Sequence, residues 1–129
     1  MIFFLLGGCK PSVSKPTKSK QNITPAKARK PSPERGKVLV QKMACYACHR
    51  IHNKGGDNGP DLTHFGSRII QQKGSEKKAR EWIVLHLQEP QKYKGMNWKE
   101  YPTVKMPSYK KKLKPQDFAD IAAFLLSLK

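Results

Sequence analysis

The chain has 129 residues, of which 37% are hydrophobic, and it carries a formal charge of +17 at pH 7. That length allows one compact domain and little else. The charge says nothing about the fold, but it favours an acidic partner, such as an anionic lipid surface, a nucleic acid or an acidic protein. No run approaches the ~20 apolar residues that a membrane-spanning helix needs, so the sequence predicts no such helix.

The first nine residues resemble the end of a bacterial lipoprotein signal. Residues 1–6 are apolar, and Gly7 and Gly8 precede Cys9, the position at which such a signal is cut and the cysteine receives its lipid. The apolar stretch is shorter than the usual ~7–15 residues and no charged segment precedes it, so the alternative is an ordinary N-terminus with a chance cysteine. On the lipoprotein interpretation, Cys9 anchors an exported protein at the periplasmic or extracytoplasmic face of a membrane.

Residues 10–33 have the composition of a disordered tether. They hold seven Lys or Arg, no Asp or Glu and five of the ten prolines, with almost no apolar side chains. Such a segment buries too little apolar surface to offset the entropy of ordering, and proline with like-charge repulsion keeps it extended. Its basic residues also suit anionic headgroups, at ~1 kcal/mol each near the surface. Residues 34–129 are the predicted folded domain.

The motif at residues 45–49, Cys-Tyr-Ala-Cys-His, is the attachment sequence for c-type haem. Two thiols one helical turn apart reach the two vinyl groups on one edge of a porphyrin, and the adjacent His49 supplies a proximal imidazole to the iron. An amphipathic segment at residues 33–44 precedes the motif and predicts a helix that leads into it. The sequence therefore predicts one covalent haem c, held by Cys45 and Cys48.

Three other interpretations of the cysteine pair compete with haem. A thioredoxin-type redox pair needs a strand before it and a βαβ setting, whereas the preceding segment has a helical pattern. A structural zinc site needs four ligands, usually with a second pair at a matching spacing, and His52, His64 and His86 form no such pair. A disulfide between the two cysteines would close a very tight loop. We favour haem over all three.

The rest of the domain is predicted to be mostly α-helical. Residues 75–89 carry several large apolar side chains and end before Pro90. Residues 115–129 begin with Pro115 at the first helical position and with Asp117 in the first turn, where it complements the helix dipole. Their apolar side chains then form one stripe along the helix. No alternating strand pattern of useful length is present.

Two long loops point to a buried cofactor independently of the motif. Residues 50–62 hold three glycines and a proline, and residues 92–113 have almost no apolar periodicity. Long irregular loops are uncommon in a compact domain unless they wrap a ligand. Three short helices with few large hydrophobic residues make a thin core, and a covalent haem supplies the missing apolar centre.

Across residues 34–129 the sequence resembles the class I c-type cytochromes, which are small mono-haem electron carriers. The resemblance is carried by Gly36-Lys37-Val38-Leu39-Val40 before the haem motif, by Gly59-Pro60-Asp61-Leu62 after it, by Met106-Pro107 and by the closing helix. Residues 96–101 depart from it, because they form a longer and more polar segment than minimal members carry. The resemblance implies a cytochrome c-like helical domain wrapped around the haem and preceded by the tether.

The resemblance also implies roles for residues around the haem. The carbonyl of Pro60 accepts a hydrogen bond from the proximal imidazole and so orients His49, as an axial histidine requires. Arg68 lies near a haem propionate, and a guanidinium suits a carboxylate in bidentate fashion. Met106, stiffened by Pro107, is the sixth ligand of the iron, since thioether ligation suits an electron carrier.

Alternatives stay open for several of these residues. Met106 is otherwise a core methionine that fills a gap. Its rivals as sixth ligand are Met96, His64 and His86, although we expect His64 to be exposed or hydrogen-bonded near the haem edge and His86 to be structural or solvated. Trp82 either packs in the core or donates its indole N–H to a propionate, because a buried Trp N–H needs a partner.

The expected function is single-electron transfer between respiratory redox partners by a monomer, without enzymatic activity. Lys110, Lys111, Lys112 and Lys114 follow the ligand motif, so they form either a docking patch for an acidic redox partner or a solvated loop. Nucleic acid is a poor fit as a partner, because the basic residues are not interleaved with stacking aromatics. The alternatives are a haem-containing subunit of a terminal oxidase or reductase complex, and a haem sensor or peroxidase-like protein with a labile sixth ligand.

Overall fold

The computed structural model describes residues 27–95 and 97–129. The predictions for Cys9, for residues 10–26 of the tether and for Met96 lie outside those residues. The described part contains four α-helices, two short 3-10 helices and no strand, and the predicted mostly α-helical class is confirmed. In chain order the elements are α1 (Pro33–Lys42), η1 (Cys45–Ala47), α2 (Phe65–Lys73), α3 (Glu76–Gln88), η2 (Trp98–Glu100) and α4 (Pro115–Ser127). None of the helices described here has the length and the apolar run required to span a bilayer.

Local sequence explains where three of the helices begin. The hydroxyl of Ser32 caps α1 by accepting from the Arg35 amide at 3.2 Å, and Pro33 follows in the first turn. Ser75 caps α3 in the same way, and Pro115 occupies the first turn of α4. A serine hydroxyl satisfies an amide that the helix leaves unpaired, and proline lacks the amide altogether. These signals place the helix starts without knowledge of the fold.

Helix α2 is the element that the sequence patterns do not predict. It has nine residues, no side chain caps its N-terminus, and its buried residues are Gly66 and Ile69. Gly74 ends the helix in the left-handed conformation, with φ at +81°, as glycine commonly does after a helix. A helix this short is marginal by itself, so its packing against α3 and α4 stabilises it.

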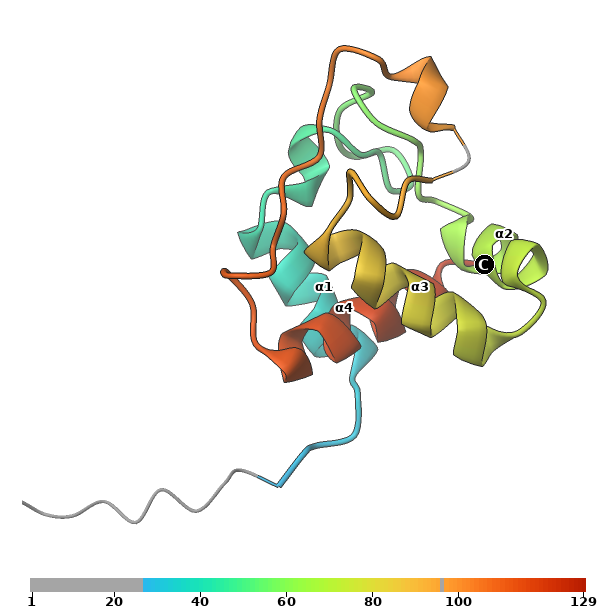
Figure 1. Ribbon diagram of the computed structural model, residues 1–129. Helices are drawn as coiled ribbons and strands as arrows, with labels where there is room; N and C mark the ends of the chain where they lie inside the picture. The colour runs from blue at the N-terminus through green and yellow to red at the C-terminus, as the bar shows by residue number, and fades with distance from the viewer. Residues whose placement is uncertain (1–26, 96) are drawn as a thin grey trace, which may run out of the picture.

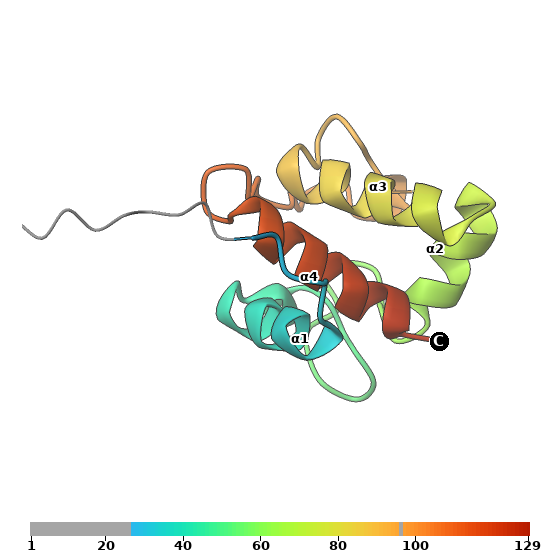
Figure 2. The same ribbon diagram turned by 90° about the horizontal axis from the view of Figure 1, so that it is seen from below.

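Helix α4 lies between α1 on one side and α3 with α2 on the other (Figures 1 and 2). Helices α1 and α4 approach each other closely at Gly36. A Cβ at Gly36 would lie 2.0 Å from the carbonyl oxygen of Asp120 and 2.8 Å from the Cβ of Phe124, so only a residue without a side chain permits this approach. The crossing fixes the direction of α1, whose C-terminal end leads into η1 and the two cysteines.

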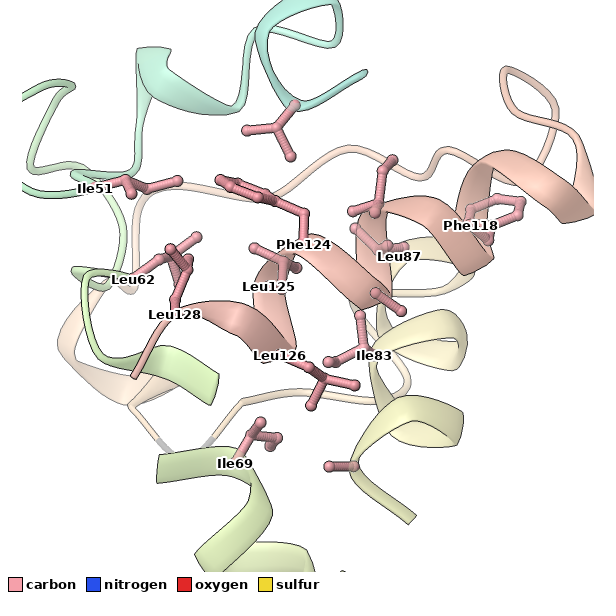
Figure 3. Packing of buried hydrophobic residues seen from close by; sticks show 14 of the residues in the cluster. Ile51, Leu62, Ile69, Ile83, Leu87, Phe118, Phe124, Leu125, Leu126 and Leu128 are labelled. Atoms are coloured by element: carbon pink, nitrogen blue, oxygen red, sulfur yellow. The ribbon is translucent and has the colours of Figure 1, made fainter. Parts of the chain in front are cut away.

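The hydrophobic core is built on α4 and extends into the loop that follows η1. Figure 3 shows Phe124 and Leu125 of α4 between Ile51 and Leu62 of that loop and Ile83 of α3. All five side chains are buried. One contiguous core therefore joins the helices to the loop that follows the cysteines.

Asp120 is the buried charged residue of the described chain, with 2% of its surface exposed. Its carboxylate accepts hydrogen bonds from the Arg35 guanidinium, the Gln116 side chain and the Ser32 amide. Burial opposes the charge, but these bonds outweigh burial and lower the pKa of Asp120. The Arg29 amide also donates to Gln116. The last residues of the predicted tether are therefore bonded to α4, and the contacts of the domain begin before residue 34.

Candidate haem site

A cavity of about 1130 Å³ lies between the helices and the two long loops. Its wall draws residues from all four α-helices, from η1, and from segments 58–62 and 90–109. Figure 1 shows the loops that follow η1 and α3 on the same side of the helices. Small-molecule sites usually enclose about 300–1,000 Å³, so this cavity suits a large ligand, and its mainly apolar wall suits an apolar one.

Cys45 and Cys48 lie on the wall of the cavity, one turn of η1 apart. Ala44 redirects the chain from α1 into this turn by adopting a left-handed φ of +57°, and the His49 amide closes it by donating to the Cys45 carbonyl at 2.9 Å. Neither thiol forms a disulfide in the described part of the chain. Burial raises the pKa of the Cys45 thiol. Both side chains are therefore available to bond a ligand in the cavity.

His49 follows directly and is held in one orientation. Its Nδ1 lies 2.8 Å from the carbonyl oxygen of Pro60, and because a carbonyl only accepts, Nδ1 carries the proton and Nε2 carries the lone pair. Gly59 allows the loop to approach this closely, since a Cβ there would lie 2.9 Å from Cε1 of the ring. The Gly59 amide donates to the Cys48 carbonyl at 2.8 Å, which ties the loop to the motif. An imidazole fixed in this way is oriented to bind a metal.

These residues fit a covalent haem and disfavour the other interpretations of the cysteine pair. In the described residues there is no group of three or more His, Cys, Asp or Glu side chains that could hold a metal ion, whereas structural zinc takes four ligands. The helix α1, rather than a strand, precedes the motif. A large apolar cavity with two thiols and one oriented imidazole on its wall matches a porphyrin with an iron at its centre.

Met106 lies on the wall of the same cavity and is half-buried against the core. Its backbone carbonyl accepts a hydrogen bond from the Gln91 side chain at 3.4 Å, so the segment that carries Met106 is linked to the end of α3. Arg68 also lines the cavity, and its guanidinium donates to the carbonyl of Asp61. The structure thus brings Met106, Arg68 and the Pro60 loop around one space.

Trp82 lines the cavity from α3 and is stacked on His86, with ring centroids 4.8 Å apart and planes inclined by 15°. The ammonium of Lys73 lies 4.9 Å from the centroid of the indole. Trp82 is therefore a half-buried residue of the cavity wall, and both roles expected for it stay predictions.

Two further residues line the wall: His86, expected from the sequence as a rival sixth ligand or a structural residue, and Tyr109, which no sequence pattern indicates. His86 lines the cavity, its Nδ1 lies 2.5 Å from the carbonyl oxygen of Tyr93, and burial lowers its pKa. Tyr109 is buried, its hydroxyl donates to the Met43 carbonyl at 3.3 Å, and burial together with the nearby Cys45 raises its pKa to about 12. The position of His86 one turn after Trp82 is the sequence signal that points to it.

The four candidate sixth ligands separate by position. Met106 and His86 lie on the wall of the cavity. His64 is exposed and its Nδ1 lies 2.7 Å from the Lys129 carbonyl oxygen, away from the cavity wall. Met96 lies outside the described residues.

Comparison with known proteins agrees with this site. Residues 33–129 match the family model described as Cytochrome c. No curated protein and no solved structure matches the chain. The matched stretch begins at the first residue of α1 and contains both cysteines and the whole cavity wall. The chain therefore belongs to the cytochrome c family, and its cofactor is a haem c bound covalently through Cys45 and Cys48.

Proposed function

We propose that this protein is a single-electron carrier, without enzymatic activity, in which His49 and Met106 are the two axial ligands of the haem iron. The observation that carries the proposal is that one cavity wall holds both thiols, an imidazole oriented through Pro60, and the Met106 thioether. His/Met ligation is typical of the electron-carrying cytochromes c. Under this proposal the protein is a class I c-type cytochrome.

Each residue has a defined task under this proposal. A bound haem supplies a one-electron iron couple, and the protein tunes that couple and controls access to it. Cys45 and Cys48 hold the porphyrin in place, and the Pro60 carbonyl keeps the His49 ring in one orientation. The Met106 thioether would occupy the sixth position of a bound haem iron and so exclude small molecules, which would leave the haem edge as the route for electrons.

The test uses holoprotein made with an export signal and haem-maturation machinery. A carrier gives a reversible one-electron wave in protein-film voltammetry, and its reduced form does not bind CO. The Met106→Ala variant should lose the Met–iron charge-transfer band of the oxidised protein, and its potential should fall because thioether ligation raises it. A wild-type protein that binds CO readily, or that turns over peroxide, would instead be a haem sensor or a peroxidase-like enzyme.

We propose an acidic redox protein as the partner. Residues 90–114 hold eight lysines and a single acidic residue, Glu100, and all eight lysines are exposed. Lys110, Lys111, Lys112 and Lys114 follow Met106 closely, beside the segment that closes the cavity. A one-sign patch at this place steers an oppositely charged partner to the haem edge, and redox encounters of this kind bury little surface.

We also propose that lipid on Cys9 anchors the protein at the outer face of a bacterial membrane, as a monomer on a tether. The support is the Gly-Gly-Cys sequence and the basic, proline-rich composition of the residues that follow it. One lipid signal with a basic segment anchors more firmly than either alone. Fractionation tests this: the full chain should sediment with membranes and incorporate labelled fatty acid, and Cys9→Ser should do neither.

A further inference from the structure

Two histidines line one cavity, and in each the Nδ1 atom is hydrogen-bonded to a backbone carbonyl. His49 and His86 both line the cavity. The Nδ1 of His49 is paired with the Pro60 carbonyl and that of His86 with the Tyr93 carbonyl, at 2.8 and 2.5 Å. A backbone carbonyl accepts and does not donate, so each ring carries its proton on Nδ1 and leaves a lone pair on Nε2.

The Nε2 atom of His86 is the part of the ring still open. One face of the ring is stacked on Trp82, and Nδ1 is taken by Tyr93. In the described residues no buried side-chain nitrogen or oxygen lacks a hydrogen-bond partner, and no described side chain bonds this Nε2. The atom therefore has accessible surface, and the residue that carries it belongs to the wall of the haem cavity.

This arrangement is the one that metal-binding histidines use. A histidine ligand donates its other ring N–H to a carbonyl or carboxylate, which fixes the tautomer and raises the basicity of the ligating nitrogen. His64 provides the contrast, because its Nδ1 is paired with the Lys129 carbonyl at the surface and it takes no part in the cavity wall.

We propose that His86 is a reserve sixth ligand of the haem iron, which binds through Nε2 when the Met106 thioether leaves the iron. The inference rests on the proposed function, in which Met106 is the resident ligand. Loss of Met106 then converts a His/Met site into a bis-histidine site rather than opening it. The iron stays closed to small molecules, and the potential falls, because His/Met ligation holds it higher. The protein would change its driving force without becoming a gas-binding or peroxide-reactive haem.

The experiment compares four holoprotein variants by electron paramagnetic resonance and near-infrared magnetic circular dichroism of the oxidised state, and by CO binding to the reduced state. The variants are Met106→Ala, Met106→Ala with His86→Gln, Met106→Ala with His64→Gln, and His86→Gln alone. Met106→Ala should be low-spin with a bis-imidazole signature and should resist CO. Adding His86→Gln should abolish that signature and give a high-spin, CO-binding haem. The matched His64→Gln addition should change nothing.

The outcomes separate this inference from the proposed function. High-spin Met106→Ala, from a wild-type protein with an intact Met–iron band, overturns the reserve role of His86 and leaves His/Met ligation standing. A low-spin spectrum that survives in the Met106→Ala, His86→Gln variant also overturns it, since another residue must then bind. A wild-type protein that already has a bis-imidazole spectrum, lost in His86→Gln alone, overturns both Met106 as resident ligand and His86 as reserve. His86→Gln alone is the fold control, and its melting temperature and haem spectrum are measured beside those of the other three variants.

Discussion

The guanidinium of Arg35 on α1 holds the buried carboxylate of Asp120 on α4 in a two-point contact, with Nε 2.8 Å from Oδ2 and Nη2 3.0 Å from Oδ1. The Ser32 amide donates to the same carboxylate at 2.8 Å. One acidic side chain thus ties together the two crossing helices and the chain that leads into them. Because α1 continues into the haem motif, this contact supports the position of the cysteines from the opposite end of the helix.

Asp120→Asn should destabilise the holoprotein at neutral pH by about 1.5–3 kcal/mol, the usual value of hydrogen bonds to a charged group. The folded-state pKa of Asp120 is lowered, because its hydrogen bonds outweigh the effect of burial. Its contribution is therefore complete above the ordinary pKa of 3.8 and is lost as the pH falls through the lower folded value. Denaturant titrations of both proteins from neutral to acid pH measure this. A difference that grows in acid would contradict the account.

Gly36→Ala should destabilise the fold at the crossing of α1 and α4. The new Cβ would lie 2.0 Å from the Asp120 carbonyl oxygen, which is backbone and cannot turn aside. Overpacking of this kind costs about 1–3 kcal/mol. The matched control is Gly74→Ala: its Cβ meets nothing within 4 Å, although its φ of +81° is strained for alanine. Thermal unfolding of the two holoprotein variants compares the steric effect at Gly36 with the backbone effect at Gly74. Equal losses of stability would argue against a tight crossing of α1 and α4.

Gly59→Ala should change the redox potential of the haem iron more than the stability of the fold. The added Cβ would lie 2.9 Å from Cε1 of His49, so the ring must turn away from the Pro60 carbonyl or the loop must shift. Partners of a ligating histidine typically affect metal affinity by 10–100-fold. If the effect differs between oxidation states, the potential moves by about 59 mV for each tenfold difference. Voltammetry and the melting temperature together decide: an unchanged potential with a lowered melting temperature would mean a purely structural role.

Much of the fold is predictable because its signals are local. A serine cap precedes α1 and α3, and a proline lies in the first turn of α1 and α4. The apolar side chains of α4 repeat at helical spacing along its length. Helix α2 is not predictable in this way, since its N-terminus lacks a side-chain cap and its stability comes from packing on α3 and α4. The glycine that ends the helix, Gly74, is the local sequence signal that α2 offers.

The same distinction holds for the site. Cys45, Cys48 and His49 lie within five consecutive residues, so a motif alone points to them. Tyr109 reaches the cavity because its amide donates to the Leu87 carbonyl at 3.0 Å and docks the loop on α3, a long-range contact that no local pattern encodes. His86 is one of the candidate sixth ligands, although its place in a helix favours a structural or solvated role. Its helical spacing from Trp82 is the feature that brings both rings to one wall.

Charge reversal tests the docking surface. Lys110→Glu, Lys111→Glu and Lys112→Glu together should slow electron exchange with a carboxylate-coated electrode by about tenfold or more at low salt. The control reverses Lys37, Lys77 and Lys78, which are exposed on α1 and α3, so the change in net charge is the same. The difference between the two variants should vanish near 1 M salt, where the screening length is about 3 Å. Equal slowing in both would mean that net charge, rather than this patch, governs the encounter.

The most direct test of the account is a proton NMR spectrum of the reduced, diamagnetic holoprotein. A methionine bound to the iron places its methyl group over the porphyrin, where the ring current shifts the signal far upfield of every other methyl. The account predicts one such methionine signal, assigned to Met106 and absent from Met106→Leu. A shifted signal that persists in Met106→Leu, or a reduced protein without any shifted methionine methyl, would contradict ligation by Met106.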